Sequence, residues 1–206
     1  PGPKADVTFI KDMYEKIRAM RHDMGNHMAV IEGLVDKGER EALDEYIGQW
    51  KKNYEESGMS VKTGNPIIDV AISEFAGRFE KSDIPFEHSF RYPEQLQINP
   101  FDMSVVITNA LQNAYEASVS AQDPSVKLTS VIRDNTFIIS LKNHIDSKAY
   151  IDPEEELPVS SKKEDGHGYG LKNIRTIARK YKGDIEIRQE VDKDGYIFVL
   201  NVMFIG

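Results

Sequence analysis

The chain has 206 residues, 40% of them hydrophobic, which is enough for one large domain or two small ones with separate cores. It contains no run of about 18 apolar residues, so no membrane-spanning helix is expected. It also contains no cysteine, which excludes disulfides and thiolate metal sites. The net charge of −8 argues against non-specific nucleic-acid binding, because no broad basic face is available for phosphates.

Residues 4–57 are expected to form two helices joined at Gly38, which suits a C-terminal helix cap. Seam residues recur at steps of three and four in both helices, a spacing typical of helices that pack along their length. They are Ile10, Met13, Ile17, Met20, Met24, His27, Ile31 and Leu34 in the first helix, and Leu43, Ile47, Trp50 and Tyr54 in the second. One hairpin buries too little by itself, so we expect two copies to pair into a four-helix bundle.

Residues 58–64 are predicted to be a linker, and residues 65–206 a second domain. Asn65-Pro66 and Asn99-Pro100 each place a capping asparagine before a proline at the first helical position. The predicted helices cover 66–81, 100–121 and about 171–181, and the predicted strands cover 84–91, 125–133, 136–143, 184–190 and 195–204. The pattern predicts an α+β domain with a mixed sheet that helices cover on one face.

The acidic segment 144–168 is predicted to be a long loop, which in a compact domain is more often a functional lid than filler. His144 is interpreted as a residue of this loop. The loop ends in "GHGYGLKNI", where Gly166, Gly168 and Gly170 precede a predicted helix. A helix N-terminus with bare backbone N–H groups in front is a ready anion site, although a flexible glycine hinge fits the stretch equally well.

The predicted helix "ITNALQNAYEAS" places Asn109, Asn113 and Glu116 on one narrow face. The residues expected in the core on the opposite face are Val106, Ala110, Leu111, Ala114 and Ala117. Asparagine is a poor helix former, and a merely solvated face would be better served by Glu, Lys or Gln. A carboxamide oxygen can bind Mg²⁺ without adding negative charge beside a polyphosphate, so we favour a magnesium–phosphate site.

"NALQNAYEA" and "GHGYGLKNI" resemble the N box and the second glycine box of the GHKL ATP-binding superfamily, which contains sensor histidine kinases and several ATPase machines. The resemblance implies a Bergerat α/β sandwich that holds ATP between the N-box helix and the lid. It implies that Asn113 holds Mg²⁺ and that Asn109 contacts the phosphates or metal-bound water. Glu116, which shares their face, is a further candidate cofactor-binding residue.

The same resemblance implies that the glycine-rich backbone wraps the triphosphate. The residues concerned are Gly166, His167, Gly168, Tyr169, Gly170 and Leu171. Lys162 is a candidate counter-charge for the phosphates, with an ordinary surface lysine as the equal alternative. Hydrolysing members of the superfamily carry Glu where this chain has Asn109. An amide cannot act as a general base, which favours transfer to a protein acceptor over transfer to water.

The segment "RHDMGNH" supplies a candidate acceptor. Heptad positions counted from Ile17 place His22 at the exposed position f and His27 inside the seam. Asp23 is adjacent to His22 and can take its proton, which keeps the nucleophilic nitrogen unprotonated. His27 is interpreted as a buried, hydrogen-bonded core histidine. A solvated surface residue is the alternative for His22.

"RHDMGNH" resembles the H box of the Agr-type peptide-pheromone (quorum-sensing) sensor kinases, and "TGNPIIDVAI" from Thr63 is also typical of that family. The resemblance runs from about residue 15 to 205. It implies that His22 is autophosphorylated and that Asn26 helps position phosphoryl chemistry or water. The usual first glycine box is absent, and Asn143 falls in its place. Agr-type kinases resemble this chain in having Asn at this position. The Asn143 carbonyl oxygen can still accept a hydrogen bond from the adenine amino group.

The leading hypothesis is therefore the cytoplasmic catalytic region of a homodimeric, membrane-anchored bacterial sensor histidine kinase. It would use ATP and Mg²⁺, and it would pass the phosphoryl group to an aspartate of a response-regulator receiver domain. The upstream sensor region would be absent from this chain, and residues 57–64 would form a hinge. The alternative is a degenerate GHKL phosphotransferase or scaffold dimer that does not bind ATP. An ATPase machine is disfavoured by Asn109.

Overall fold

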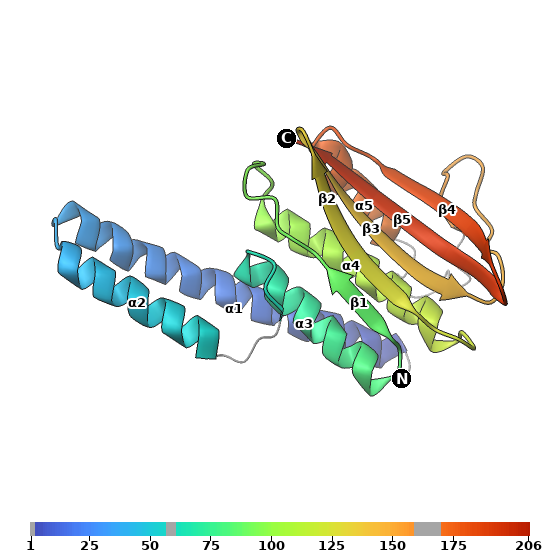
Figure 1. Cartoon of the computed structure of the whole chain (residues 1–206), viewed down its shortest axis with the longest axis horizontal. Helices are drawn as coiled ribbons and strands as arrows, with labels where there is room; N and C mark the ends of the chain where they lie inside the picture. Colours follow the sequence, from blue (N-terminus) through green and yellow to red (C-terminus); the bar gives the residue numbers. More distant parts are fainter. Residues whose placement is uncertain (1–2, 57–60, 159–169) are drawn as a thin grey trace. The chain divides into compact units, whose positions relative to one another are not determined.

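The computed structural model describes residues 3–56, 61–158 and 170–206, with the side chains of residues 3–7, 10, 20 and 54–56 left out. The chain divides into two compact units, Pro1–Lys62 and Thr63–Gly206 (Figure 1). The first unit is helical and the second is an α/β sandwich, which confirms the predicted fold class. No helix among the described residues is long and apolar enough to cross a membrane.

The helical unit consists of α1 (Pro3–Asp36) and α2 (Arg40–Glu56). The chain reverses at Gly38, which has a φ of +70°. The N–H of Glu39 donates to the carbonyl of Leu34 at 3.0 Å. The predicted glycine cap is therefore confirmed, because only a left-handed residue brings these two groups together in this way.

His27 ties the two helices of this unit together. Its Nδ1 lies 2.5 Å from the Tyr46 hydroxyl, and its ring stacks on Trp50 with centroids 5.1 Å apart. The predicted hydrogen bond is confirmed. The predicted burial is only partial, since His27 is half-buried in the single chain.

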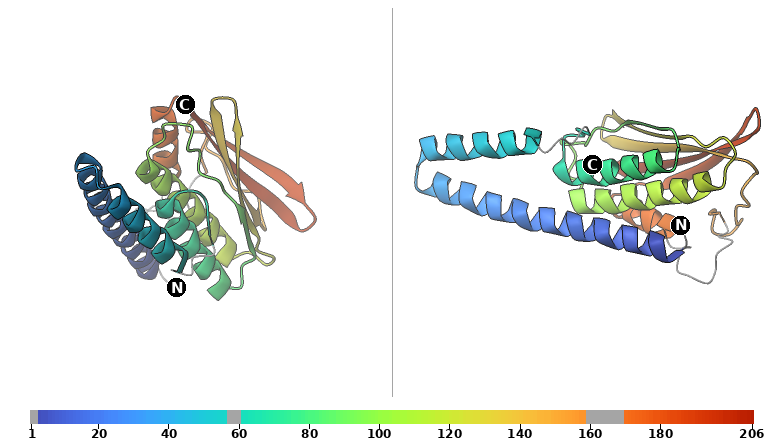
Figure 2. Two further views of the ribbon diagram at one scale, coloured as in Figure 1. Left: turned by 60° about the vertical axis from the view of Figure 1, so that its left-hand side comes forward. Right: turned by 90° about the horizontal axis from the view of Figure 1, so that it is seen from below.

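The described residues of the α/β unit form three helices and five strands. They are α3 (Pro66–Lys81), β1 (Phe86–Ser89), α4 (Pro100–Val119), β2 (Val126–Arg133), β3 (Thr136–Ile145), α5 (Gly170–Lys180), β4 (Ile185–Asp192) and β5 (Gly195–Ile205). The sheet order is β1-β2-β3-β5-β4, with β1 parallel to β2 and the remaining pairs antiparallel. Figure 2 shows the three helices on one face of this mixed sheet, as predicted, with α4 packed against both α3 and α5.

The start of the α/β unit is fixed to α3 by a buried carboxylate. Asp69 accepts hydrogen bonds from the backbone N–H and the hydroxyl of Thr63, both at 2.6 Å. Asn65 caps α3 by accepting from the N–H of Ile67 at 3.0 Å. Asn99 caps α4 in the same way, by accepting from the N–H of Phe101 at 2.8 Å. Both predicted asparagine caps are confirmed.

Alternate residues of β3 face the helices and form part of the core. Phe137, Ile139 and Leu141 on this face are buried, and Asn143 continues the same row at its end. The strand register pairs Asn143 with Phe198 of β5, which in turn pairs with Gln189 of β4. At this end, the row of the sheet that faces the helices therefore includes two amide side chains, those of Asn143 and Gln189.

Three details differ from the sequence predictions. The strand β3 runs to Ile145, so His144 lies inside a strand and is only 4% exposed; its interpretation as a loop residue is wrong. The N–H of His144 donates to the carbonyl of Ser125, which extends the strand through polar sequence. The helix α4 ends at Val119 rather than at residue 121. Ala117 is half-buried, because it lies at the edge of the apolar stripe rather than at its centre.

Candidate functional site

Asn109, Asn113 and Glu116 lie half-buried on one face of α4, while the opposite face of the helix is buried in the core. The Asn109 amide nitrogen donates to the carbonyl of Val105 at 2.8 Å. This bond satisfies the donor of Asn109 within the helix. The three residues give the face two carboxamides and one carboxylate, which are oxygen donors of the kind that Mg²⁺ prefers.

The first residue of α5 lies against this polar face. A β-carbon built on Gly170 would lie 3.4 Å from Asn109 Oδ1. Glycine therefore lets the N-terminus of α5 approach the amide closely. The last glycine of the glycine-rich stretch thus lies against the face of α4 that carries Asn109 and Asn113. The contact combines a helix N-terminus, which favours anions, with neutral amides whose oxygens are of a kind that can bind Mg²⁺.

Asn143 lies at the helix-facing end of β3 and is 2% exposed. Among the described residues, its amide nitrogen has no hydrogen-bond partner. Leaving a buried amide unpaired costs about 1–3 kcal/mol, so a ligand that pairs with it would recover this free energy. An amide offers one donor and one acceptor side by side, which match the edge of an adenine base.

The segment after β3 is held in place close to Asn143. The Ala149 N–H donates to Gln189 Oε1 at 2.7 Å, and Gln189 Nε2 donates back to the Ala149 carbonyl at 3.0 Å. Glu155 is held on α5, where Lys172 Nζ lies 3.1 Å from its carboxylate and Arg175 donates to its carbonyl. The first part of the predicted loop is therefore a docked turn, and its partners lie too far away in sequence to be predicted.

Five of the predicted nucleotide-binding residues lie outside the described residues. They are Lys162, Gly166, His167, Gly168 and Tyr169. Gly170 and Leu171 are described, as the first two residues of α5. The roles predicted for the glycine-rich stretch therefore remain predictions, apart from the observed approach of Gly170 to Asn109.

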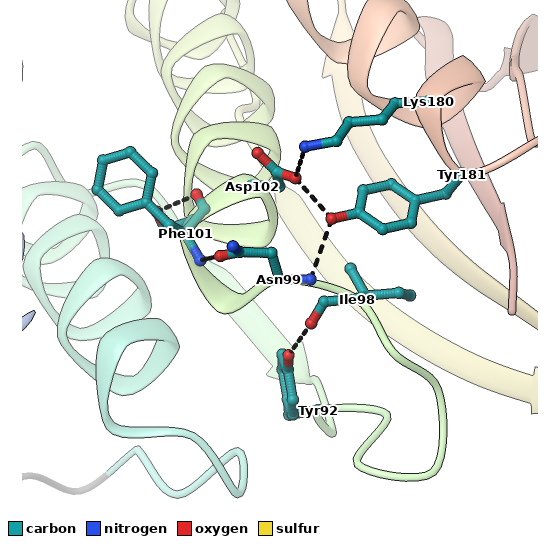
Figure 3. A network of polar contacts seen from close by, with 8 residues as sticks. Tyr92, Ile98, Asn99, Phe101, Asp102, Lys180 and Tyr181 are labelled. Atoms are coloured by element: carbon teal, nitrogen blue, oxygen red, sulfur yellow. Dashed lines mark hydrogen bonds and ion pairs between the residues drawn. The ribbon is translucent and has the colours of Figure 1, made fainter. Parts of the chain in front are cut away.

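A network of hydrogen bonds joins the start of α4 to the end of α5 (Figure 3). Asp102 accepts from Lys180 Nζ at 2.7 Å and from the Tyr181 hydroxyl at 2.5 Å. The Tyr181 oxygen accepts in turn from the N–H of Asn99 at 3.0 Å. Burial alone would raise the pKa of the Asp102 carboxyl, but the two hydrogen bonds it accepts lower that pKa below its ordinary value.

This network matters for the site because it aligns the two helices that build it. The helices α4 and α5 are in contact, with Asp102 and Lys180 near one end of the pair and Asn109 and Gly170 further along. Sequence reasoning missed the network. Asp102 and Lys180 are ordinary charged residues, and only the packing of α5 on α4 brings them together.

In the helical unit, His22 lies beside Asp23 and Asn26, the two residues predicted to assist it. Asp23 Oδ1 lies 3.8 Å and Asn26 Nδ2 3.4 Å from the same ring nitrogen, Nδ1. The imidazole is 78% exposed, as its heptad position predicts. The two neighbours favour opposite tautomers, because the nearby Asp23 carboxylate favours a proton on Nδ1, whereas the Asn26 amide can donate a hydrogen bond only to an unprotonated Nδ1. With the proton on Nδ1, the other nitrogen, Nε2, keeps its lone pair.

No group of three or more His, Cys, Asp or Glu side chains in the described ranges could hold a metal ion. A magnesium ion bound mainly by nucleotide oxygens and water would not need such a group.

Two family models match the chain. Residues 98–205 match the GHKL domain, and residues 4–63 match the alpha-helical domain of the SpoOB-type sensor kinases. The two matches cover the α4–β5 part of the α/β unit and the helical unit.

Two curated relatives are sensor proteins. The chain is 31% identical over 136 residues to the C4-dicarboxylate transport sensor protein DctB of Rhizobium meliloti, a match that covers 63% of this chain and 20% of the relative. It is 19% identical over 196 residues to the probable C4-dicarboxylate sensor kinase of Halalkalibacterium halodurans, covering 91% of this chain and 37% of the relative. The chain thus spans only a minor part of both relatives.

The chain is similar to solved structures of histidine kinases, and its likeness to the first of the two below concerns the fold alone. The mycobacterial sensor histidine kinase MprB matches with a TM-score of 0.50 at 16% identity, over 66% of this chain and 93% of that structure. The catalytic domain of the histidine kinase ThkA matches with a TM-score of 0.49 at 23% identity, over 68% of this chain and 92% of that structure.

Proposed function

Because the chain belongs to the GHKL domain family and also carries a SpoOB-type sensor-kinase helical domain, we propose that it is the catalytic region of a two-component sensor histidine kinase. ATP bound by the α/β unit phosphorylates His22, and the phosphoryl group then passes to an aspartate of a response-regulator receiver domain. The observation that carries the proposal is the approach of Gly170 to Asn109, which joins a helix N-terminus to a face of neutral amides.

The nucleotide roles follow from the chemistry of each side chain. Asn143 pairs with the adenine edge, and this role is supported by its buried amide nitrogen, which has no partner in the part of the chain that the structure describes. Asn113 holds Mg²⁺, which draws negative charge from the phosphate oxygens. Asn109 contacts the phosphates or metal-bound water. The proposal includes the glycine-rich residues 166–171 as the wrapping backbone and Lys162 as a counter-charge.

His22 is the proposed acceptor. With its proton on Nδ1 beside Asp23, the Nε2 lone pair attacks the γ-phosphorus and ADP leaves with the electrons of the broken P–O bond. Asn26 lies beside the same ring and is placed to position water when the phosphoryl group is removed. His27 is the poorer candidate, because Tyr46 occupies its Nδ1 and Trp50 covers one face of its ring.

The kinase is proposed to act as a homodimer. Met28, Val30 and Val35 of α1 are 57%, 43% and 57% exposed within the single chain. They flank the heptad seam, and a second hairpin in a four-helix bundle would cover them. We further propose that the region lies on the cytoplasmic side of a bacterial membrane, below a sensor region that is not part of this chain.

The finer assignment, to the peptide-pheromone sensor kinases, rests on "RHDMGNH" and "TGNPIIDVAI" alone. The two matched relatives carry C4-dicarboxylate in their names, and the resemblance to pheromone sensors stays a prediction. The names of the relatives and the sequence motifs therefore point to two different classes of signal, C4-dicarboxylates and peptide pheromones.

Isothermal titration calorimetry tests the claim on which the proposal depends, that the chain binds ATP. We expect the chain to bind ATP in the presence of Mg²⁺ and Asn113→Ala to lose the Mg²⁺-dependent part of the affinity. Asn53→Ala, which removes an exposed helical asparagine from α2, should bind as the parent does. No binding by the parent at millimolar ATP would favour the alternative, a phosphotransferase or scaffold dimer that does not use ATP.

A further inference from the structure

A chain of side-chain contacts runs from α3 to the asparagine face of α4. Arg78 Nη1 donates to Gln112 Oε1 at 2.7 Å, and Gln112 Nε2 donates to Glu116 Oε1 at 2.8 Å. Arg78 lies in the last turn of α3, before the residues that match the GHKL domain, so the family match gives it no role. The contacts nevertheless end on the face that carries Asn113.

Arg78 is held in place by more than this hydrogen bond. Its guanidinium carbon lies 3.9 Å from the centroid of the Tyr115 ring, which attracts the cation. The Tyr115 hydroxyl lies 3.0 Å from the Ser82 hydroxyl at the end of α3. A half-buried guanidinium fixed at two points keeps its positive charge in one position.

The position of this charge is important because of Glu116. This carboxylate lies one helical turn beyond Asn113 and shares its face. A triphosphate bound beside Asn113 would be repelled by a free carboxylate in a partly buried site, where like charges are poorly screened. A carboxylate that accepts a hydrogen bond and lies close to an arginine repels much less.

We infer that Arg78 is a positioning residue of the nucleotide site: through Gln112 it holds the Glu116 carboxylate in place and offsets its charge, so that the face around Asn113 accepts a triphosphate. The inference rests on the proposed function and adds a residue to it. Arg78 does not touch the nucleotide; it acts through the two α4 side chains.

A double-mutant cycle with Mg²⁺–ATP as the ligand tests this role. Arg78→Met should raise the Kd of the full chain about tenfold, because it exposes the triphosphate to the Glu116 charge. Glu116→Gln alone supplies the second reference Kd of the cycle. In the double variant the Kd should lie within about threefold of the Glu116→Gln value, since the charge that Arg78 offsets is gone.

Gln112→Leu is the second variant, since it breaks the link and leaves Arg78 on Tyr115. It should raise the Kd in the same direction, and Glu116→Gln should again suppress the effect. Arg133→Met removes an exposed arginine from the end of β2 and controls for the net charge. Thermal unfolding of each variant identifies loss of fold.

Additive effects of Arg78→Met and Glu116→Gln would overturn the inference, because a merely structural arginine does not depend on the charge at Glu116. An unchanged Kd in Arg78→Met would overturn it as well. These outcomes leave the proposed function standing as long as the parent binds ATP. A parent that does not bind ATP overturns both.

Discussion

The two units place their polar residues in opposite ways. In the helical unit, His22, Asp23 and Asn26 all lie on one exposed stretch of a single helix. In the α/β unit, the polar groups come from several elements, and Asn143 is almost fully buried. An exposed histidine is accessible to a second protein surface, whereas a buried amide can meet only a ligand that enters the fold. The comparison therefore supports the proposed roles of His22 as the phosphoryl acceptor and of Asn143 as part of the nucleotide site.

The largest effect is expected at the acceptor. His22→Gln should reduce labelling by the γ-phosphate of ATP to background, because glutamine has no imidazole nitrogen to attack phosphorus. Its affinity for ATP should stay unchanged. The measurement is autoradiography together with calorimetry on the same protein.

His27→Gln is the matched control. It should keep the labelling and lower the stability of the helical unit by about 1 kcal/mol, because it loses the contacts to Tyr46 and Trp50. If labelling survived in His22→Gln and were lost in His27→Gln, His27 would be the acceptor. The contrast between an exposed acceptor and a buried binding site would then no longer hold.

A second large effect is expected at Asn143. Asn143→Leu should weaken ATP binding at least about tenfold, since a paired amide contributes about 1–3 kcal/mol to the recognition of adenine. The free energy of unfolding of the free protein should not fall, because leucine removes a buried donor that lacks a partner among the described residues. Calorimetry and urea unfolding measure the two quantities.

Asn201→Leu is its control, because the register places Asn201 beside Ser140, on the opposite face of the sheet. It should leave the ATP affinity unchanged. If Asn143→Leu instead lost several kcal/mol of stability, the amide would be a structural group, and the contrast between the two units would be weaker.

A smaller effect is expected from the network in Figure 3. The pKa of Asp102 is lowered in the folded protein, so its charged form adds stability at neutral pH. This stability is lost as the pH falls below the ordinary carboxyl value of 3.8 and through the lowered value. Asp102→Asn should therefore lower the melting temperature at neutral pH and flatten its decline on the acid side. A variant that melts in parallel with the parent at every pH would show that the charge contributes nothing.

The smallest effect is expected where Gln189 holds Ala149. Gln189→Ala removes both hydrogen bonds, and the Ala149 amide should exchange its hydrogen about tenfold faster, given about 1 kcal/mol for such a contact. Hydrogen-exchange mass spectrometry over residues 146–158 measures this. Unchanged exchange would mean that the contact between Glu155 and α5 holds the segment by itself.

How much of the site could be predicted depends on how local its contacts are. The grouping of His22 with Asp23 and Asn26 follows from helical spacing, and so does the stripe that contains Asn113. The link from Arg78 to Gln112 depends on how α3 packs on α4, which spacing does not determine. The polar, acidic sequence of residues 144–168 predicts a loop at His144, although backbone pairing with Ser125 and β5 keeps it in a strand.

The buried contact between Thr63 and Asp69 has a consequence for protein engineering. Because both donors of Thr63 satisfy a carboxylate inside α3, the α/β unit already begins at Thr63 rather than at the proline that starts the helix. A chimera that joins a foreign sensor to this α/β unit should therefore have its fusion point upstream of Thr63. A fusion point at Asn65 would replace Thr63 and deprive the Asp69 carboxylate of two donors, and the graft would carry a destabilised α3 whatever sensor was attached.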